Sequence, residues 1–295
     1  FIILGFGLAS KLRRFNVATT AELFEIKYKS STLRKIASLA SALCMIGLLV
    51  GQIVASHNLF NALGIGSDLI LFIFWVFVII YTVTGGLKAV VITDVFQVIL
   101  LISIVTGVFA YIVYGEGSLF FSVKEMVARQ SSFNFGRLDL YANIPILVAS
   151  ALYPLFGQDL AQRFFSAKTK KVAAVSALLA SAIMLLFSFI PVYFGMKARL
   201  LGLVITEGTS VFMSVVSALC SDVVVALIAC ALVAAVTSTA DSLLCAISSN
   251  IAQDFDYSEL TKLSKLFISK VITVVAGGVA MALAYYSSNI LGVLI

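Results

Sequence analysis

The sequence predicts an all-α integral membrane protein. Its 295 residues are 61% hydrophobic and only 12% charged, whereas an average globular domain is about 25% charged. The mean hydropathy is +1.12, and the apolar runs are long enough to cross a bilayer as helices. The chain has three prolines and no ten-residue segments of alternating polarity, which argues against a membrane barrel.

The elements follow from the apolar runs in order. Residues 1–9 end a span that the basic residues Lys11, Arg13 and Arg14 close. Thr19 then offers a hydroxyl cap, which predicts a short interfacial helix. Full spans are expected at 36–60, 69–84, 90–114, 144–165, 172–194, 223–251 and 267–286, which makes about seven full helices plus one partial. Because Phe1 lies within an apolar run and is not Met, we expect a fragment of a longer protein.

Basic residues set the expected orientation. Fifteen of the 20 Lys and Arg residues fall in one set of alternate connections and five in the other. By the positive-inside rule the richer set is cytoplasmic, so the segment 115–140 is expected to be external. This topology accounts for the net charge of +6, and no nucleic-acid motif accompanies it.

Cysteine and histidine give no sign of a metal or catalytic centre. The four cysteines have no CxxC spacing and are expected to pack as small apolar residues. The single histidine, His57, has no acidic or cysteine neighbour in sequence and is expected to be structural. An enzyme would need a nucleophile with its base, or a metal cluster, so we expect neither catalysis nor a cofactor, and no metal centre.

The most informative stretch is the polar interruption within residues 232–254. Ser238, Asp241 and Ser242 share one helical face, and Asp241 lies roughly 27 Å along the span at 1.5 Å per residue, inside a core about 30 Å thick. An ionisable group at such depth typically marks an ion or substrate pathway. Hydroxyl and carboxylate oxygens are ligands for hard cations. The stretch therefore predicts part of a cation site.

Structural explanations exist for some of these polar groups. Hydroxyls such as those of Thr237 and Ser248 can bond back to a carbonyl one turn earlier or allow close helix packing. A salt bridge to Asp241 would need a basic residue in mid-span, and no basic residue lies in the middle of a predicted span.

A second motif is the segment 81–97, in which Gly85 and Gly86 are expected to end one helix directly before the next. Asp94 and Gln97 have the spacing of a capping box. Residues 87–92 are apolar, however, which would place Asp94 inside the second helix. There the carboxylate needs a partner, and a cation shared with Ser238 and Asp241 would supply one.

A third motif is the segment 153–168, where a proline and a glycine interrupt a span in mid-membrane. Tyr153 lies just before the break and can be a packing aromatic whose hydroxyl finds a partner nearby. Arg163 is expected to mark the cytoplasmic face, with Gln158 and Asp159 as its partners.

Together the three motifs resemble the sodium:solute symporter family. The matching letters are Gly-Gly…Thr-Asp…Gln in 81–97, Gln…Gln-Arg…Ala-Lys in 157–168 and Ala-Ala…Ser-Thr-Ala-Asp-Ser in 234–242. The resemblance implies an inverted-repeat core of two five-helix halves. One transporter domain, 1–295, would hold part of the first repeat in 1–114, an external loop in 115–140 and part of the second repeat in 141–295. The first core helix and the C-terminal end of the family would lie outside this sequence.

The resemblance also implies a sodium site on the helix that contains 232–254. Its ligands would be the hydroxyls of Ser238 and Thr239 and the carbonyl of Ala235. The family's remaining ligands are carbonyls of the first core helix.

Some members of the family have a second cation site, and the matching positions here are Asp94, Ser238, Asp241 and Ser242. Several members have a hydroxyl where Asp241 stands, so sodium and a proton both remain open for this site. Tyr153 matches an aromatic residue that serves as a substrate gate in sugar-carrying members.

The expected function is therefore sodium-coupled secondary symport of a small organic solute by alternating access, in the cell (inner) membrane as a multi-pass protein. The solute would be an amino acid, a carboxylate or a vitamin-like compound. Sugar is disfavoured because apolar residues surround Met184, where sugar carriers place a lysine. The implied partners are the solute, sodium and the lipid bilayer, with no nucleic acid. The alternatives are proton coupling through Asp94 and Asp241, and a transporter-like sensor domain.

Overall fold

The structure is a computed structural model, and all regular structure in its described part is helical. It describes residues 2–15, 17–115, 144–145, 147–150, 152–153, 157–204, 210–257 and 264–286. The helices are η1 (Leu4–Leu8), α1 (Ala9–Leu12), α2 (Thr20–Tyr28), α3 (Ser31–Ala62), α4 (Asp68–Gly115), α7 (Gln158–Phe165), α8 (Lys170–Phe187), α9 (Phe189–Leu200), α10 (Val211–Leu219), α11 (Asp222–Asp254) and α12 (Lys265–Tyr286).

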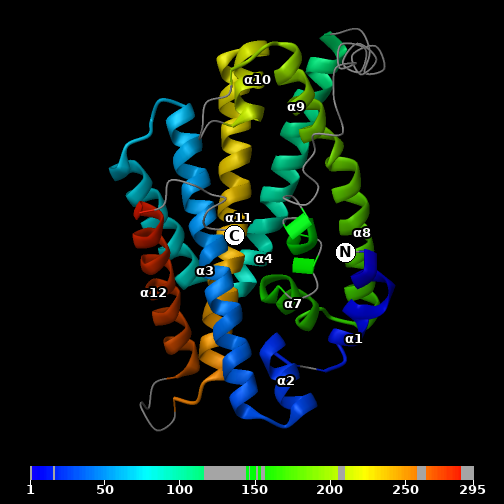
Figure 1. Cartoon of the computed structure of the whole chain (residues 1–295), viewed down its shortest axis with the longest axis vertical. Helices are drawn as coiled ribbons and strands as arrows, with labels where there is room; N and C mark the ends of the chain where they lie inside the picture. The colour runs from blue at the N-terminus through cyan, green and yellow to red at the C-terminus, as the bar shows by residue number, and fades with distance from the viewer. Residues whose placement is uncertain are drawn as a thin grey trace.

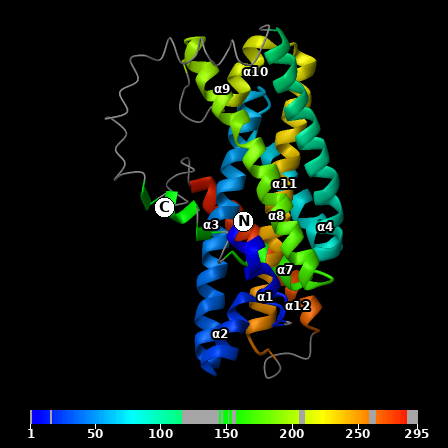
Figure 2. The ribbon, with the colours of Figure 1, turned by 90° about the vertical axis from the view of Figure 1, so that its right-hand side faces the viewer.

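Helix α11 lies at the centre of the bundle, with α3 and α4 beside it and α12 on its outer side (Figure 1). It also contacts α10 near one end and α7 and α2 toward the other. The view turned by 90° again shows α11 between α3 and α4 (Figure 2). Residues 240–248 are all buried, and a helix that is buried all round is the core of its domain.

Five helical segments in the described part are long and apolar enough to cross a membrane: Ser31–Ala62, Asp68–Gly115, Lys170–Leu200, Asp222–Asp254 and Lys265–Tyr286. Large apolar side chains cover their outer faces, and Phe77 and Phe96 of α4 and Leu186 of α8 are more than half exposed. An exterior this apolar is suited to lipid rather than to water. The prediction of an all-α integral membrane protein is thereby confirmed.

The two spans expected at 69–84 and 90–114 are the two arms of α4, which bends sharply between them. Gly86 has φ 60° and ψ −174° inside the helix, a conformation essentially restricted to glycine. The two ends of α4 consequently lie toward the same end of the bundle (Figure 1). The expected interruption at the glycine pair is therefore found, at its second member.

Other expected boundaries differ modestly. The span expected at 172–194 continues through α8 and α9 to Leu200, and the short helix α10 lies in a segment expected to be a loop. The loop residues 116–140 lie outside the described residues, as do residues 146, 151 and 154–156 of the span expected at 144–165. The short helix expected after Thr19 is found as α2, and the Thr19 hydroxyl accepts the Glu22 N–H as its cap.

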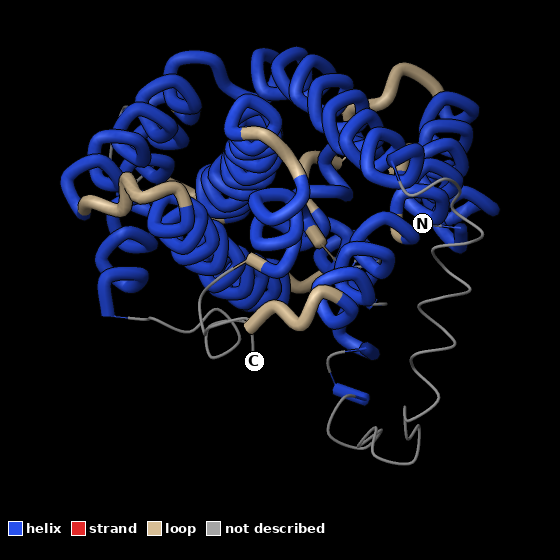
Figure 3. The backbone as a smooth tube through the Cα atoms, turned by 90° about the horizontal axis from the view of Figure 1, so that it is seen from above, coloured by secondary structure: helices blue, strands red, loops and turns tan. Residues whose placement is uncertain are grey.

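Two apolar cores hold the bundle together on either side of the polar centre. One combines side chains such as Met45 and Leu49 of α3, Trp75 of the first arm of α4, and Leu243 and Ile247 of α11. Figure 3, seen from above, shows the described helices packed side by side in the bundle.

The second core joins the other arm of α4 to α9, α10 and the start of α11, through residues such as Val105, Phe194, Val216 and Ile228. Both arms of α4 are thus fixed to α11 by apolar packing. The polar residues of α4 and α11 must therefore face each other between the two cores.

Candidate ion-binding site between α4, α7 and α11

Asp94 lies inside the second arm of α4, eight residues after the bend, where it faces α11 and α7. Ser238 of α11 donates its hydroxyl to Asp94 Oδ1. Arg163 of α7 forms an ion pair with the other carboxylate oxygen, with Nη2 and Oδ2 2.7 Å apart. The same nitrogen contacts the hydroxyl of Ser242, which is bonded to the carbonyl of Ser238 at 3.0 Å. Three elements distant in sequence therefore meet at one carboxylate.

The partners expected for Arg163 were wrong. Its ion pair is formed with Asp94 rather than with Asp159. The Arg163 side chain is therefore directed toward α4. Gln158 instead anchors the start of α7 to the segment before α2, through Thr20 N–H at 2.7 Å and the Ala18 carbonyl at 3.2 Å. This anchor holds α7 across the end of the bundle, so that Arg163, on the last turn of α7, reaches Asp94.

Asp94 is not a helix cap, because regular α-helix precedes it. Gln97, the other residue of the capping-box spacing, donates to the hydroxyl of Thr237 at 3.0 Å. Thr237 also bonds back to the carbonyls of Val233 and Ala234 at 3.0 Å, as expected for a membrane hydroxyl. The reading that places Asp94 in the helix interior is confirmed.

Asp241 faces the other arm of α4 and has different partners. It is fully buried, and the Tyr81 hydroxyl donates to Asp241 Oδ2. Thr82 Oγ1 lies 2.8 Å from Asp241 Oδ1 and 2.8 Å from the Val78 carbonyl. Among the described residues no basic side chain forms an ion pair with Asp241. The hydrogen-bond partners of Asp241 in the described part are hydroxyl groups. Burying an ionised carboxylate without a cation is costly.

The four residues of the candidate second site are thus not equivalent in the structure. Asp94, Ser238 and Ser242 form one cluster with Arg163. Asp241 lies one turn from Ser238 on α11 but turns toward the first arm of α4. Asp94 of α4 and Asp241 of α11 therefore belong to separate hydrogen-bonded groups, one with each arm of α4.

The residues of the other candidate site are close together on α11. The Thr239 hydroxyl donates to the Ala235 carbonyl at 3.0 Å, and Thr239 is exposed on the surface of the described bundle. Ser238, its neighbour in sequence, turns toward Asp94 instead. Of the three proposed sodium ligands, Thr239 and Ala235 therefore contact each other. The third, Ser238, belongs to the Asp94 cluster.

Tyr153 is half-buried and donates its hydroxyl to Asp159 Oδ1 at 2.7 Å. This bond ties the residue before the expected helix break to the first turn of α7. Its aromatic ring is held beside the segment that contains Gly157, whose missing Cβ would lie 3.1 Å from the Tyr153 ring. Both the packing role and the gating role remain compatible with this position.

A second polar network lies at the C-terminal end of α11. Arg34 of α3 contacts Asp254 at 2.8 Å and Glu25 of α2 at 2.6 Å. The Asp254 side chain is fully buried, and Thr19 donates to it at 2.6 Å. Helices α2, α3 and α11 are thus joined where the chain enters the bundle.

Neither His57 nor the cysteines form a metal centre in the described part of the chain. His57 lies within α3, near Asn61 at 3.4 Å and Asp68 at 3.8 Å. No group of three His, Cys, Asp or Glu residues suited to a metal ion occurs among the described residues. The four cysteines are free thiols.

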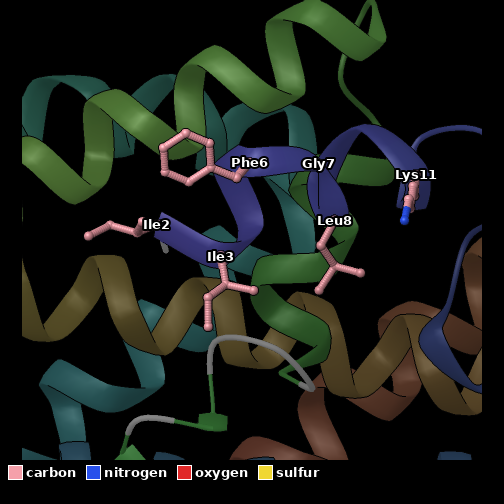
Figure 4. Close-up of a pocket in the computed structure, with 6 residues that line it drawn as sticks. All are labelled: Ile2, Ile3, Phe6, Gly7, Leu8 and Lys11. Carbon is pink, nitrogen blue, oxygen red and sulfur yellow. The ribbon is translucent and has the colours of Figure 1, made fainter.

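A surface hollow near the start of the chain is unrelated to these sites. It is lined by Ile2, Ile3, Phe6, Gly7, Leu8 and Lys11 (Figure 4). Its lining residues come from η1, α1 and the two residues before η1, and they include none of the carboxylates and hydroxyls that mark the centre of the bundle.

No motif in the sequence predicted a role for Tyr81 or Thr82. The capping-box spacing predicted a different role for Gln97 from the one observed, and the partners expected for Arg163 differ from Asp94. A signal for the first two existed, because adjacent hydroxyls at the end of an otherwise apolar run require polar partners. Nothing in the local sequence of Arg163 pointed to a carboxylate 69 residues away.

Comparison with known proteins agrees with the geometry. The sodium/pantothenate symporter of Escherichia coli (strain K12) is 28% identical over 125 residues, which are 42% of this chain and 26% of that protein. A solved structure of the substrate-bound, outward-open state of a Na⁺-coupled sialic acid symporter superimposes with a TM-score of 0.72 at 22% identity. The superposition covers 97% of this chain and 66% of the other. The chain therefore has the helical transporter fold but spans only part of the length of these relatives.

A family model extends the agreement to the full sequence. The model described as the sodium:solute symporter family matches residues 1–295. All three motifs of the sequence fall within the match. On this evidence the chain belongs to the sodium:solute symporter family.

Proposed function

We propose that this chain forms the ion-binding part of a sodium-coupled symporter for a small organic solute, working by alternating access. The observation that carries the proposal is the contact between the Ser238 hydroxyl of α11 and the Asp94 carboxylate of α4 at the centre of a membrane bundle. Oxygen ligands from two helices, deep in an apolar surrounding, are suited to a small hard cation. Family membership supports sodium as that cation.

Sodium would bind at the Thr239 hydroxyl and the Ala235 carbonyl, which already contact each other, with Ser238 as the third ligand. A cation there would hold one face of α11, while the opposite faces remain packed against α3, α4 and α12. Because α11 contacts so many elements, a small shift at the cation can move helices at both ends of the bundle. This is how ion binding would be coupled to the opening and closing of a solute path.

The solute is proposed to be a carboxylate, an amino acid or a vitamin-like acid. The two similar proteins are named for pantothenate and for sialic acid, and both compounds carry a carboxylate. Uptake of such solutes from outside would place the protein in the cell (inner) membrane. Tyr153, held by Asp159 beside the break before α7, is the proposed gate.

The proposal is tested with the full-length protein reconstituted in liposomes. Uptake of a panel of carboxylates and amino acids should require an inward sodium gradient. The double variant Ser238→Ala with Thr239→Ala should need a sodium concentration at least tenfold higher for half-maximal uptake. Ser248→Ala is the matched control, because the Ser248 hydroxyl only bonds back to Cys245 at 3.1 Å. Unchanged sodium dependence in the double variant would reject the site assignment.

Proton coupling is the second candidate, and the surroundings of Asp241 favour it. Thr82 has one hydroxyl proton but lies at hydrogen-bond distance from both the Val78 carbonyl and Asp241 Oδ1. If Thr82 donates to Val78, a proton on Asp241 is needed to complete the second bond. Asp241 is therefore the group proposed to carry a proton.

A further inference from the structure

The guanidinium group of Arg163 contacts two of the four residues of the candidate second cation site, Asp94 and Ser242. Its Nη2 atom carries two N–H groups and has two acceptors, Asp94 Oδ2 at 2.7 Å and the hydroxyl of Ser242. Ser238 donates to the remaining oxygen of the same carboxylate. The positive charge of Arg163 is thus placed where the charge of a bound ion would be needed.

An inorganic cation at this site would use the same oxygens. Hard cations bind carboxylate and hydroxyl oxygens at about 2.3–2.6 Å, which is close to the nitrogen–oxygen distance of the Arg163–Asp94 pair. A metal ion and Nη2 on the same oxygens would be two positive charges in near contact. The guanidinium and the ion therefore exclude each other.

Arg163 can clear the site only by moving. A guanidinium group does not lose its proton in proteins, so deprotonation is not available. The Arg163 side chain is 39% exposed, and its Nε atom has no hydrogen-bond partner among the described residues. The two bonds of Nη2 are the hydrogen bonds that join this guanidinium to α4 and α11, and a competing cation would replace both.

We infer that Arg163 is a tethered cation that competes with a monovalent inorganic cation for the oxygens of Asp94, Ser238 and Ser242. Its position sets the affinity of this site, and occupation by an ion displaces the side chain from α11. The inference rests on the proposed cation coupling but goes beyond it, since it makes an arginine of α7 a competitor of the ion rather than a ligand or a topological signal.

Direct binding of radioactive sodium to the purified full-length protein tests the competition. Arg163→Gln removes the charge while keeping a hydrogen-bond donor. It should lower the sodium dissociation constant at least tenfold or add one bound sodium per protein. Arg163→Lys keeps the charge and should bind sodium as the wild type does. Methylguanidinium in solution should compete with sodium in Arg163→Gln.

Two variants control for indirect effects. Arg14→Gln removes an exposed basic residue that lies away from the site and should leave sodium binding unchanged. Adding Asp94→Asn to Arg163→Gln should abolish the gain. If Arg163→Gln binds sodium like the wild type, or loses binding as Asp94→Asn does, Arg163 is a positioning residue and the inference is overturned.

A measurement on the wild type keeps the test independent of any folding defect. Labelling of Arg163 by phenylglyoxal, followed by mass spectrometry, should increase severalfold when sodium replaces choline. Equal labelling in both salts would overturn the inference. Failure of the proposed function would appear differently, as wild-type uptake that no sodium gradient drives, whereas failure of this inference leaves sodium-driven uptake intact.

Discussion

Arg163 and Asp94 form an ion pair inside the bundle, with Nη2 and Oδ2 2.7 Å apart, although 69 residues separate them in the chain. Asp94 belongs to the segment expected to be part of the first repeat and Arg163 to the segment expected to be part of the second. The pair therefore joins the two expected halves of the transporter at the helix that carries the candidate ion ligands.

Replacement of Asp241 by Asn should separate proton coupling from sodium coupling. Asn keeps the size of the side chain and can still bond to Tyr81 and Thr82, but it cannot carry a proton that comes and goes. If Asp241 is the proton carrier, uptake driven by a pH gradient without sodium should be lost in Asp241→Asn.

Thr82→Val is the companion variant, since it removes the hydroxyl shared between Asp241 and Val78 at nearly constant shape. It should weaken pH-driven uptake without abolishing it. Retention of pH-driven uptake in Asp241→Asn would exclude Asp241 as the carrier.

Asp254→Ala should destabilise the protein by about 3 kcal/mol, because it leaves the partly buried Arg34 without its buried partner. Denaturation in mixed micelles, followed by the fluorescence of the buried Trp75, measures the loss. Glu25→Gln is the control: the Glu25 side chain is 37% exposed, and such pairs contribute less than about 1 kcal/mol. Equal losses of unfolding free energy in the two variants would show that burial of Asp254 does not strengthen its ion pair with Arg34.

Tyr153→Phe should raise the KM for solute about threefold to tenfold with little change in kcat. The variant keeps the aromatic ring but removes the bond to Asp159, and one such bond contributes about 1 kcal/mol. Tyr257→Phe is the control, because its hydroxyl bonds to the Ile251 carbonyl at 3.2 Å, away from α7. A KM equal to that of the wild type would leave Tyr153 with a packing role alone.

Gly86→Ala should destabilise the bend of α4 by about 1–3 kcal/mol, because a side chain strains the conformation at φ 60° and ψ −174°. Thermal unfolding of the purified protein checks this. Gly107→Ala on the same helix should cause no loss, since nothing lies within 4 Å of the Cβ it would add and alanine favours a helix. Similar melting of both variants would show that the bend tolerates a side chain.

The sequence alone determined the class of the protein and the positions of most helices. Long apolar runs can bury their backbone only as membrane helices, so the spans of α3, α11 and α12 were predictable within a few residues. The hydroxyl cap at Thr19 and the interruption at Gly86 were also predictable, because each depends on local backbone chemistry. The motif residues Asp94, Ser238, Asp241 and Ser242 were likewise recognised from their chemistry.

Only the tertiary structure decided which of these residues meet. The face that a helix turns toward its neighbours depends on packing against side chains far away in sequence, so Asp241 turned toward Tyr81 and Thr82 while Ser238 turned toward Asp94. The sequence around Arg163 is typical of a basic residue at a membrane face. Gln158 fixes the start of α7 to Thr20, and in this position of α7 the Arg163 side chain contacts Asp94. The partner that a long side chain can reach depends on the position of its helix, and contacts between segments distant in sequence set that position.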